Sequence, residues 1–132
     1  MGKKRTRKEL QTPEAFEKTL REEVSVSAEF DLPLAALALV VEDGWQEEDV
    51  RRALDTLRAV DLVAQPAAEE LLVALPNTGL ADAQVVEERL REAIPKATAG
   101  VAPYRQGDTA EDLLERAQKA VCRRVAEKPE AT

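Results

Sequence analysis

The stretch LAALALVV, residues 34–41, decides the fold class. It is a continuous apolar run that follows Pro33 and ends at the turn sequence Glu42-Asp43-Gly44. A short apolar segment between such boundaries predicts a strand that is buried on both faces. The same alanines and leucines are compatible with a helix, and an all-helical structure with a helix at 34–41 would contradict this prediction.

Helical and extended patterns alternate on both sides of this strand. Apolar residues at helical spacing predict helices over residues 13–30, 47–58, 79–94 and 109–126, and extended segments cover 61–65, 69–75 and 97–102. The short connection at residues 66–68 predicts an antiparallel hairpin. The order as a whole predicts an α+β fold, a ferredoxin-like sheet of about four to five strands with helices on one face. We expect the last two helices to pack through Leu90, Ile94, Leu113 and Ala117.

The length of 132 residues is enough for one domain with a modest core. We expect this domain at residues 12–127, between a basic disordered tail at 1–11 and a second disordered tail at 128–132. The first eight residues carry five positive charges, although the net charge of the chain is −7. A basic tail can contact nucleic acid or an acidic partner, but a solubilising terminus is the simpler explanation, and no function is based on it.

Composition excludes several classes of site. The chain has no histidine, which excludes histidine triads and histidine-ligated metals. Its one cysteine excludes an internal disulfide and a cysteine metal cluster. Aromatic residues are only 3 %, which disfavours base stacking on nucleic acid. No apolar run has membrane-spanning length. We therefore expect a cytoplasmic protein without cofactors and without membrane contact.

Two C-terminal stretches resemble a known family. The sequence DLVAQPAAEELLVALPNTGLADAQVVEERLREAI, residues 61–94, is similar to the GGDEF domains of diguanylate cyclases, as is GVAPYRQGDTAEDLLERAQKAVCRR, residues 100–124. With a weaker N-terminal match, the resemblance extends over about residues 12–125. It implies a cytoplasmic bacterial signalling protein with a GGDEF-type sheet, shortened relative to the family.

Within this resemblance, the positions that carry catalysis depart from the family pattern. The signature hairpin reads Ala-Ala-Glu-Glu-Leu at residues 67–71, where the family's two glycines let the backbone approach nucleotide phosphates. Val40 stands where the family has a metal-binding aspartate, with Glu42 two residues later. The guanine-binding segment, here residues 44–58, is short and lacks histidine. The resemblance thus implies a degenerate GGDEF domain that is not an enzyme and holds no metal.

One site of the family has its charged residues in register. Arg58-Ala59-Val60-Asp61 matches the Arg-x-x-Asp product-binding motif, and Arg89 matches a further arginine of that site. An arginine can bind the O6/N7 edge of guanine, a carboxylate can accept from its N–H groups, and a second arginine can neutralise a phosphate. The resemblance implies cyclic di-GMP as ligand. A structural interpretation is also open, in which Arg58 meets a helix dipole and Asp61 faces solvent.

Two functional hypotheses follow from the sequence. The first is a cyclic di-GMP receptor or regulatory module that uses Arg58, Asp61 and Arg89. The alternative is a ligand-free protein–protein interaction or scaffold module on the same fold, with a protein partner or self-association and with nucleic-acid contact limited to the basic tail.

The remaining side chains of note have structural interpretations. We expect Glu69 and Glu70 to be solvated hairpin charges and Trp45 to cap the core, an exposed Trp45 being instead an interface anchor. We expect Cys122 to be a buried, inert thiol.

Overall fold

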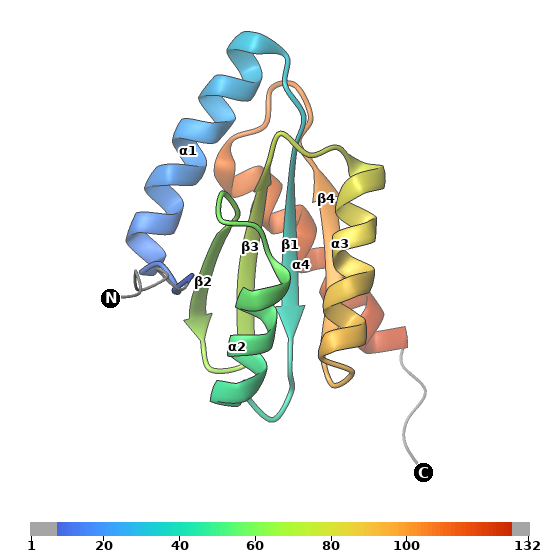
Figure 1. Cartoon of the computed structure of the whole chain (residues 1–132). Coiled ribbons are helices and arrows are strands. Elements are labelled where there is room, and N and C mark those ends of the chain that lie inside the picture. Colours follow the sequence, from blue (N-terminus) through green and yellow to red (C-terminus); the bar gives the residue numbers. More distant parts are fainter. Residues whose placement is uncertain (1–7, 128–132) are drawn as a thin grey trace, which may run out of the picture.

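Eight elements follow one another in the computed structural model, which describes residues 8–127 (Figure 1). They are α1 (Pro13–Phe30), β1 (Leu34–Val40), α2 (Glu47–Thr56), β2 (Leu62–Ala67), β3 (Glu70–Pro76), α3 (Leu80–Ala93), β4 (Thr98–Pro103) and α4 (Ala110–Glu127). This order confirms the predicted α+β fold, with predicted and observed boundaries differing by a few residues at most. Residues 1–7 of the tail predicted at 1–11, and the whole tail predicted at 128–132, lie outside the described residues.

The four strands form one antiparallel sheet in the order β2-β3-β1-β4. β1 is an interior strand, and Leu37 lies opposite Val73 on one side and Val101 on the other. Nearly all of its side chains are buried, as expected for an uninterrupted apolar run. β2 and β3 form the predicted hairpin, which closes at the pair Ala67 and Glu70. The strand prediction for 34–41 is confirmed, and the helical alternative is wrong.

Helices cover both faces of the sheet. The prediction of helices on one face is confirmed for α2 and α3, which connect the strands of the ferredoxin-like order, and wrong for α1 and α4, which cover the other face. Figure 1 shows α2 and α3 in front of the sheet and α4 behind it. Leu37 and Leu39 of β1 pack in one apolar cluster with Leu90 and Ile94 of α3. The alternate β1 residues pack in a second cluster with α1 and α4, which supply Phe16, Leu20, Leu113 and Ala117. An interior strand that is apolar at every position needs a cover on each face.

The first helix begins at Pro13, and the side chain of its N-cap residue Thr12 accepts a hydrogen bond from the Ala15 N–H at 3.1 Å. Residues 8–11, predicted as part of the disordered tail, lie along the sheet edge. The Gln11 N–H donates to the Val63 carbonyl oxygen at 2.8 Å, so the chain pairs briefly with β2 before α1 begins.

Cys122 is exposed on α4, which corrects the prediction of a buried thiol. The buried side of α4 is defined by Leu113, Ala117 and Val121, at the spacing of four residues that marks one helix face. Cys122 lies one residue beyond Val121, about 100° around the helix, and this rotation places it outside the stripe.

Candidate functional site

Arg58 and Asp61 lie together in the turn that joins α2 to β2. The Arg58 backbone N–H donates to Asp61 Oδ2 at 2.7 Å, and Arg58 Nη2 donates to Asp61 Oδ1 at 2.8 Å. Arg58 Nε is within 3.2 Å of the same Oδ1. The carboxylate therefore accepts from both the main chain and the side chain of Arg58, which fixes the turn and the arginine rotamer together.

Arg58 also reaches the turn between β3 and α3. Its Nη2 donates to Thr78 Oγ1 at 2.8 Å and to the Pro76 carbonyl oxygen at 3.2 Å. The Thr78 hydroxyl in turn donates to the same carbonyl at 2.9 Å. These partners were not foreseen from the sequence, where Thr78 is only part of the Leu-Pro-Asn-Thr end of a strand. Arg58 thus connects two turns at one end of the sheet.

The two side chains differ in exposure, with Arg58 at the surface and Asp61 buried beneath it. The Arg58 side chain is 52 % exposed, whereas the Asp61 side chain is 1 % exposed. The structural interpretation placed Arg58 in the last turn of a helix and Asp61 in solvent. Both placements are wrong, since Arg58 lies beyond the last residue of α2 and Asp61 is buried. Because both carboxylate oxygens are occupied by Arg58, Asp61 is not accessible to a ligand in this conformation.

Lys8 lies on the inner side of the same turn. Its Nζ donates to the Ala59 carbonyl oxygen at 3.2 Å and to the Asp61 carbonyl oxygen. Burial lowers the pKa of Lys8, and the negative charge of Asp61 partly offsets that effect. A residue predicted to belong to a disordered tail therefore helps to hold the main chain of the candidate site.

Arg89 is exposed in the third turn of α3. It lies nine residues beyond Leu80, the first residue of the helix, which corresponds to about 14 Å along the helix axis. Within the described part of the chain, neither a hydrogen bond nor an ion pair joins Arg89 to Asp61. The structure therefore joins Arg58 and Asp61 directly and shows no contact between Asp61 and Arg89.

The signature hairpin is held by the loop that follows β1. The Trp45 N–H donates to the Ala68 carbonyl oxygen at 2.9 Å, and Trp45 Nε1 donates to the Glu69 carbonyl oxygen at 3.0 Å. The Val41 N–H donates to the same Glu69 oxygen at 2.9 Å. Trp45 is 9 % exposed, which confirms its predicted place as a cap over the core. Three donors from one loop thus fix two carbonyls of the hairpin turn.

Val40 and Glu70 face each other across β1 and β3. Glu70 Oε2 accepts a hydrogen bond from Gln118 Nε2 of α4 at 3.1 Å, while Glu69 and Glu42 are exposed. Among residues 8–127, no three histidine, cysteine, aspartate or glutamate side chains are grouped so that they could hold a metal ion. The described helices include none that is long and apolar enough to cross a membrane.

Solved structures share this fold. No family model matches the chain, and no curated protein matches it. The diguanylate cyclase SiaD of Pseudomonas aeruginosa, solved with its activator SiaC, superposes with a TM-score of 0.76 at 25 % identity over 89 % of this chain. The present chain spans about half (55 %) of SiaD.

Two isolated domains match over nearly their whole length. The GGDEF domain of YfiN (TpbB) from Pseudomonas aeruginosa gives a TM-score of 0.81 at 21 % identity, with 91 % of this chain and 92 % of that domain covered. The GGDEF domain of DgcB from Caulobacter crescentus, solved with cyclic di-GMP, gives 0.77 at 15 % identity, with 96 % and 93 % covered. The chain is therefore a GGDEF-like domain in fold, and the predicted resemblance is confirmed.

The prediction that the chain is not an enzyme is contradicted by these neighbours. They include the diguanylate cyclase SiaD and the active domain of a diguanylate cyclase from Vibrio cholerae, and the fold points to that enzyme family. The prediction weighed single side chains such as Val40 against the family pattern. The fold is instead set by the apolar residues of β1 and of the helices that cover it, and it is this fold that superposes on the diguanylate cyclase SiaD.

Proposed function

We propose that this GGDEF-like domain binds cyclic di-GMP, with Arg58 as its principal contact. The observation that carries the proposal is the geometry of Arg58. Asp61, Thr78 and a main-chain carbonyl fix its guanidinium, yet half of its side chain faces solvent. An arginine that is already ordered loses little conformational freedom when a ligand binds.

The guanidinium retains the groups that guanine recognition needs. Its hydrogen bonds to residues within 8–127 use Nε and Nη2, and none of them uses Nη1. Nη1 is therefore left to donate to guanine O6 or N7, or to a phosphate oxygen. The exposed face of the planar guanidinium also suits stacking against a purine. Both modes keep the contact with Asp61 intact.

Asp61 and Arg89 then have different parts in the proposed site. Asp61 is a positioning residue, because its buried carboxylate orients Arg58 and does not reach the ligand. Arg89, exposed on α3, is proposed to meet a second guanine or phosphate of the same ligand, which has two of each. The proposal gains support from the fold, since the DgcB domain, which shares it, was solved with cyclic di-GMP.

Calorimetric titration with cyclic di-GMP tests the proposal. We expect Arg58→Ala to weaken binding about ten- to a hundredfold, the value of one charged contact. Arg123, an exposed arginine on α4, is the matched control, and Arg123→Ala should leave the affinity within about twofold of wild type. Since the fold is that of an enzyme family, GTP is kept out of the titration so that no product forms. Equal binding by Arg58→Ala and wild type would refute the assignment.

The alternative, a protein interaction module, has a place on the surface as well. Phe30 at the end of α1 is 63 % exposed, and Val26 and Leu32 beside it are each 40 % exposed. Neighbouring apolar side chains in solvent are typical of a contact surface. The SiaD structure was solved with a protein activator. If wild type binds no cyclic di-GMP, this end of α1 is the surface to test for a partner.

A further inference from the structure

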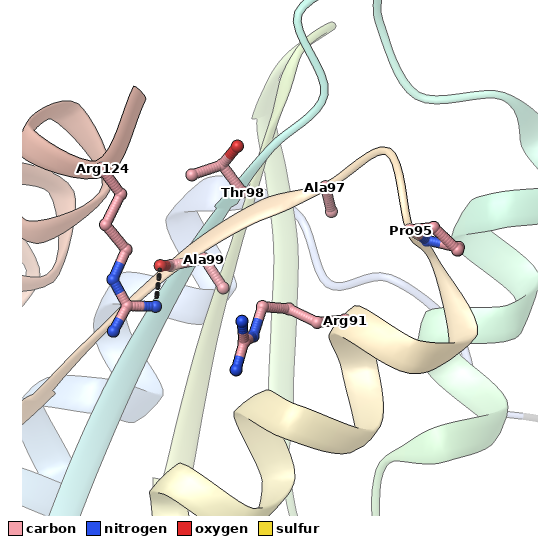
Figure 2. A pocket seen from close by; sticks show the side chains of 6 residues that line it. All are labelled: Arg91, Pro95, Ala97, Thr98, Ala99 and Arg124. Carbon is pink, nitrogen blue, oxygen red and sulfur yellow. Dashed lines mark hydrogen bonds between the residues drawn. The ribbon is translucent and has the colours of Figure 1, made fainter. Parts of the chain in front are cut away.

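A cavity of about 390 Å³ lies at the edge of the sheet beside the first residues of β4. Figure 2 shows its lining, with Pro95 and Ala97 from the chain that leads into β4. Arg91 of α3 and Arg124 of α4 extend toward each other on either side of Ala99 (Figure 2). The volume falls in the range of about 300–1,000 Å³ that is typical of small-molecule sites.

A buried carboxylate holds the two arginines at this cavity. Glu87 Oε1 is 3.2 Å from Arg124 Nη1 and 3.9 Å from Arg91 Nε. The Glu87 side chain is only 5 % exposed, and its second oxygen makes no hydrogen bond within the described residues. Arg124 Nη1 also donates to the Ala99 carbonyl oxygen at 2.8 Å. Two like charges thus stay close because a negative charge lies between them.

Both guanidiniums have N–H donors that the contacts described above do not use. The Arg91 and Arg124 side chains are 48 % and 45 % exposed, and the contacts above use only Nε of Arg91 and Nη1 of Arg124. Each arginine has five N–H donors. Together with Glu87 the cluster carries a net charge of +1, which is a local positive site on a chain of net charge −7. An anion is the ligand that such a cluster selects.

The arrangement favours a phosphate group over a carboxylate. The guanidiniums come from different helices and approach from two sides (Figure 2). A phosphate monoester carries a charge of about −1.5 to −2 and has three acceptor oxygens, so it can accept from both guanidiniums at once. A carboxylate is planar and singly charged. The apolar wall of Pro95, Ala97 and Ala99 suits the uncharged body to which the phosphate is attached.

We propose that Arg91 and Arg124, held by Glu87, form a binding site for a small phosphate monoester at the edge of β4. The site is separate from Arg58 and does not depend on the proposed cyclic di-GMP function. Glu87 is its positioning residue, and the two arginines are its contacts.

Phenyl phosphate is the probe, and amide and arginine Nε resonances of labelled protein are the readout. We expect saturable shifts of Ala97, Thr98, Ala99 and the two arginines at millimolar ligand. Arg91→Gln is the cleaner variant, because Arg91 makes only a loose contact in the fold. It should weaken binding about tenfold or more, and Arg124→Gln should do the same. The matched control Arg123→Gln and the variant Arg58→Ala should bind as wild type does.

Each other outcome overturns the proposal. Absence of shifts at residues 97–99 at about 10 mM phenyl phosphate excludes a site of useful affinity. Equal weakening by Arg123→Gln means that the anion is attracted by the general charge of α4. Benzoate that binds as tightly as phenyl phosphate means that the ligand class is wrong. If Arg91→Gln binds normally while the amides of wild type shift, the arginine pair is not the site.

Discussion

The contact between α4 and β4 depends on the absence of a side chain at Gly100. A Cβ at this position would lie 2.5 Å from the Val121 nitrogen, 2.7 Å from the Ala117 carbonyl oxygen and 2.8 Å from the Ala120 Cβ. The first two atoms belong to the backbone of a helix and cannot rotate away as a side chain can. Gly100→Ala therefore forces α4 away from the sheet by a large part of an ångström.

The cost follows from what α4 covers. Overpacking a core typically costs about 1–3 kcal/mol and occasionally more. Here the displaced helix carries Leu113, Ala117 and Val121, all buried in the same cluster, so we expect about 3 kcal/mol or more. The free energy of unfolding of a small domain is about 5–15 kcal/mol in total. Urea unfolding followed by circular dichroism should show a much lower midpoint with an unchanged slope.

Two other glycines provide matched controls. Gly107 has φ +93°, and no atom of the described residues would lie within 4 Å of a Cβ at this position, so Gly107→Ala tests backbone strain alone, about 1–2 kcal/mol. At Gly79 the nearest contact is 3.9 Å, to Pro33 Cβ, and alanine there should cost about 1 kcal/mol or less, as the loss of a glycine N-cap. If Gly100→Ala is no more destabilising than Gly107→Ala, the described packing of α4 on β4 is incorrect.

Three further predictions follow from single contacts. The hydrogen bonds from Arg116 lower the pKa of Asp108, so the ionised carboxylate stabilises the fold above its unfolded pKa, and this stabilisation is lost as the pH falls below about 4. In urea titrations at pH 2–7, Asp108→Asn should therefore show a smaller fall in the free energy of unfolding at acid pH than wild type. Asp61→Ala removes the acceptor of three Arg58 groups and should lower the free energy of unfolding in urea by about 2–3 kcal/mol; the loss is no larger because Arg58 is half exposed and is rehydrated. A loss under about 0.5 kcal/mol would contradict the positioning role of Asp61. Trp45→Phe loses the bond to a hairpin carbonyl and should cost about 1–2 kcal/mol in the same assay; no loss would mean that the indole N–H is not needed there.

The sheet was predictable because its central strand carries a strong local signal. The run at residues 34–41 is apolar at every position and lies between Pro33 and the turn sequence 42–44, which favours an interior strand, although its alanines and leucines are also compatible with a helix. The crossover helices α2 and α3 share one face, as the order of elements predicted, and the other face of the same apolar strand is covered by α1 and α4, which lie outside that order. Cys122 was misplaced because one residue of helix is a rotation of about 100°.

The candidate site was predictable only where its residues are close in sequence. Arg58 and Asp61 are three positions apart, so a turn brings them together. Thr78 completes the arginine's environment from 20 residues away, and its part depends on the packing of two turns. The cavity beside β4 is a stronger case, because Arg91 and Arg124 meet only through the fold. No local sequence pattern predicts that two residues so far apart in the sequence lie at one cavity.

The most direct test of the central claim is the Arg58 side-chain resonance during a titration with cyclic di-GMP. Our account predicts a saturable shift of Arg58 Nε–H, with Arg123 unmoved and the Asp61 amide little changed, because Asp61 stays buried against its partner. The affinity from this shift should match that from calorimetry. Two results would contradict the account. In the first, the ligand binds but the Arg58 signal does not shift; in the second, no binding is detected at about 1 mM ligand.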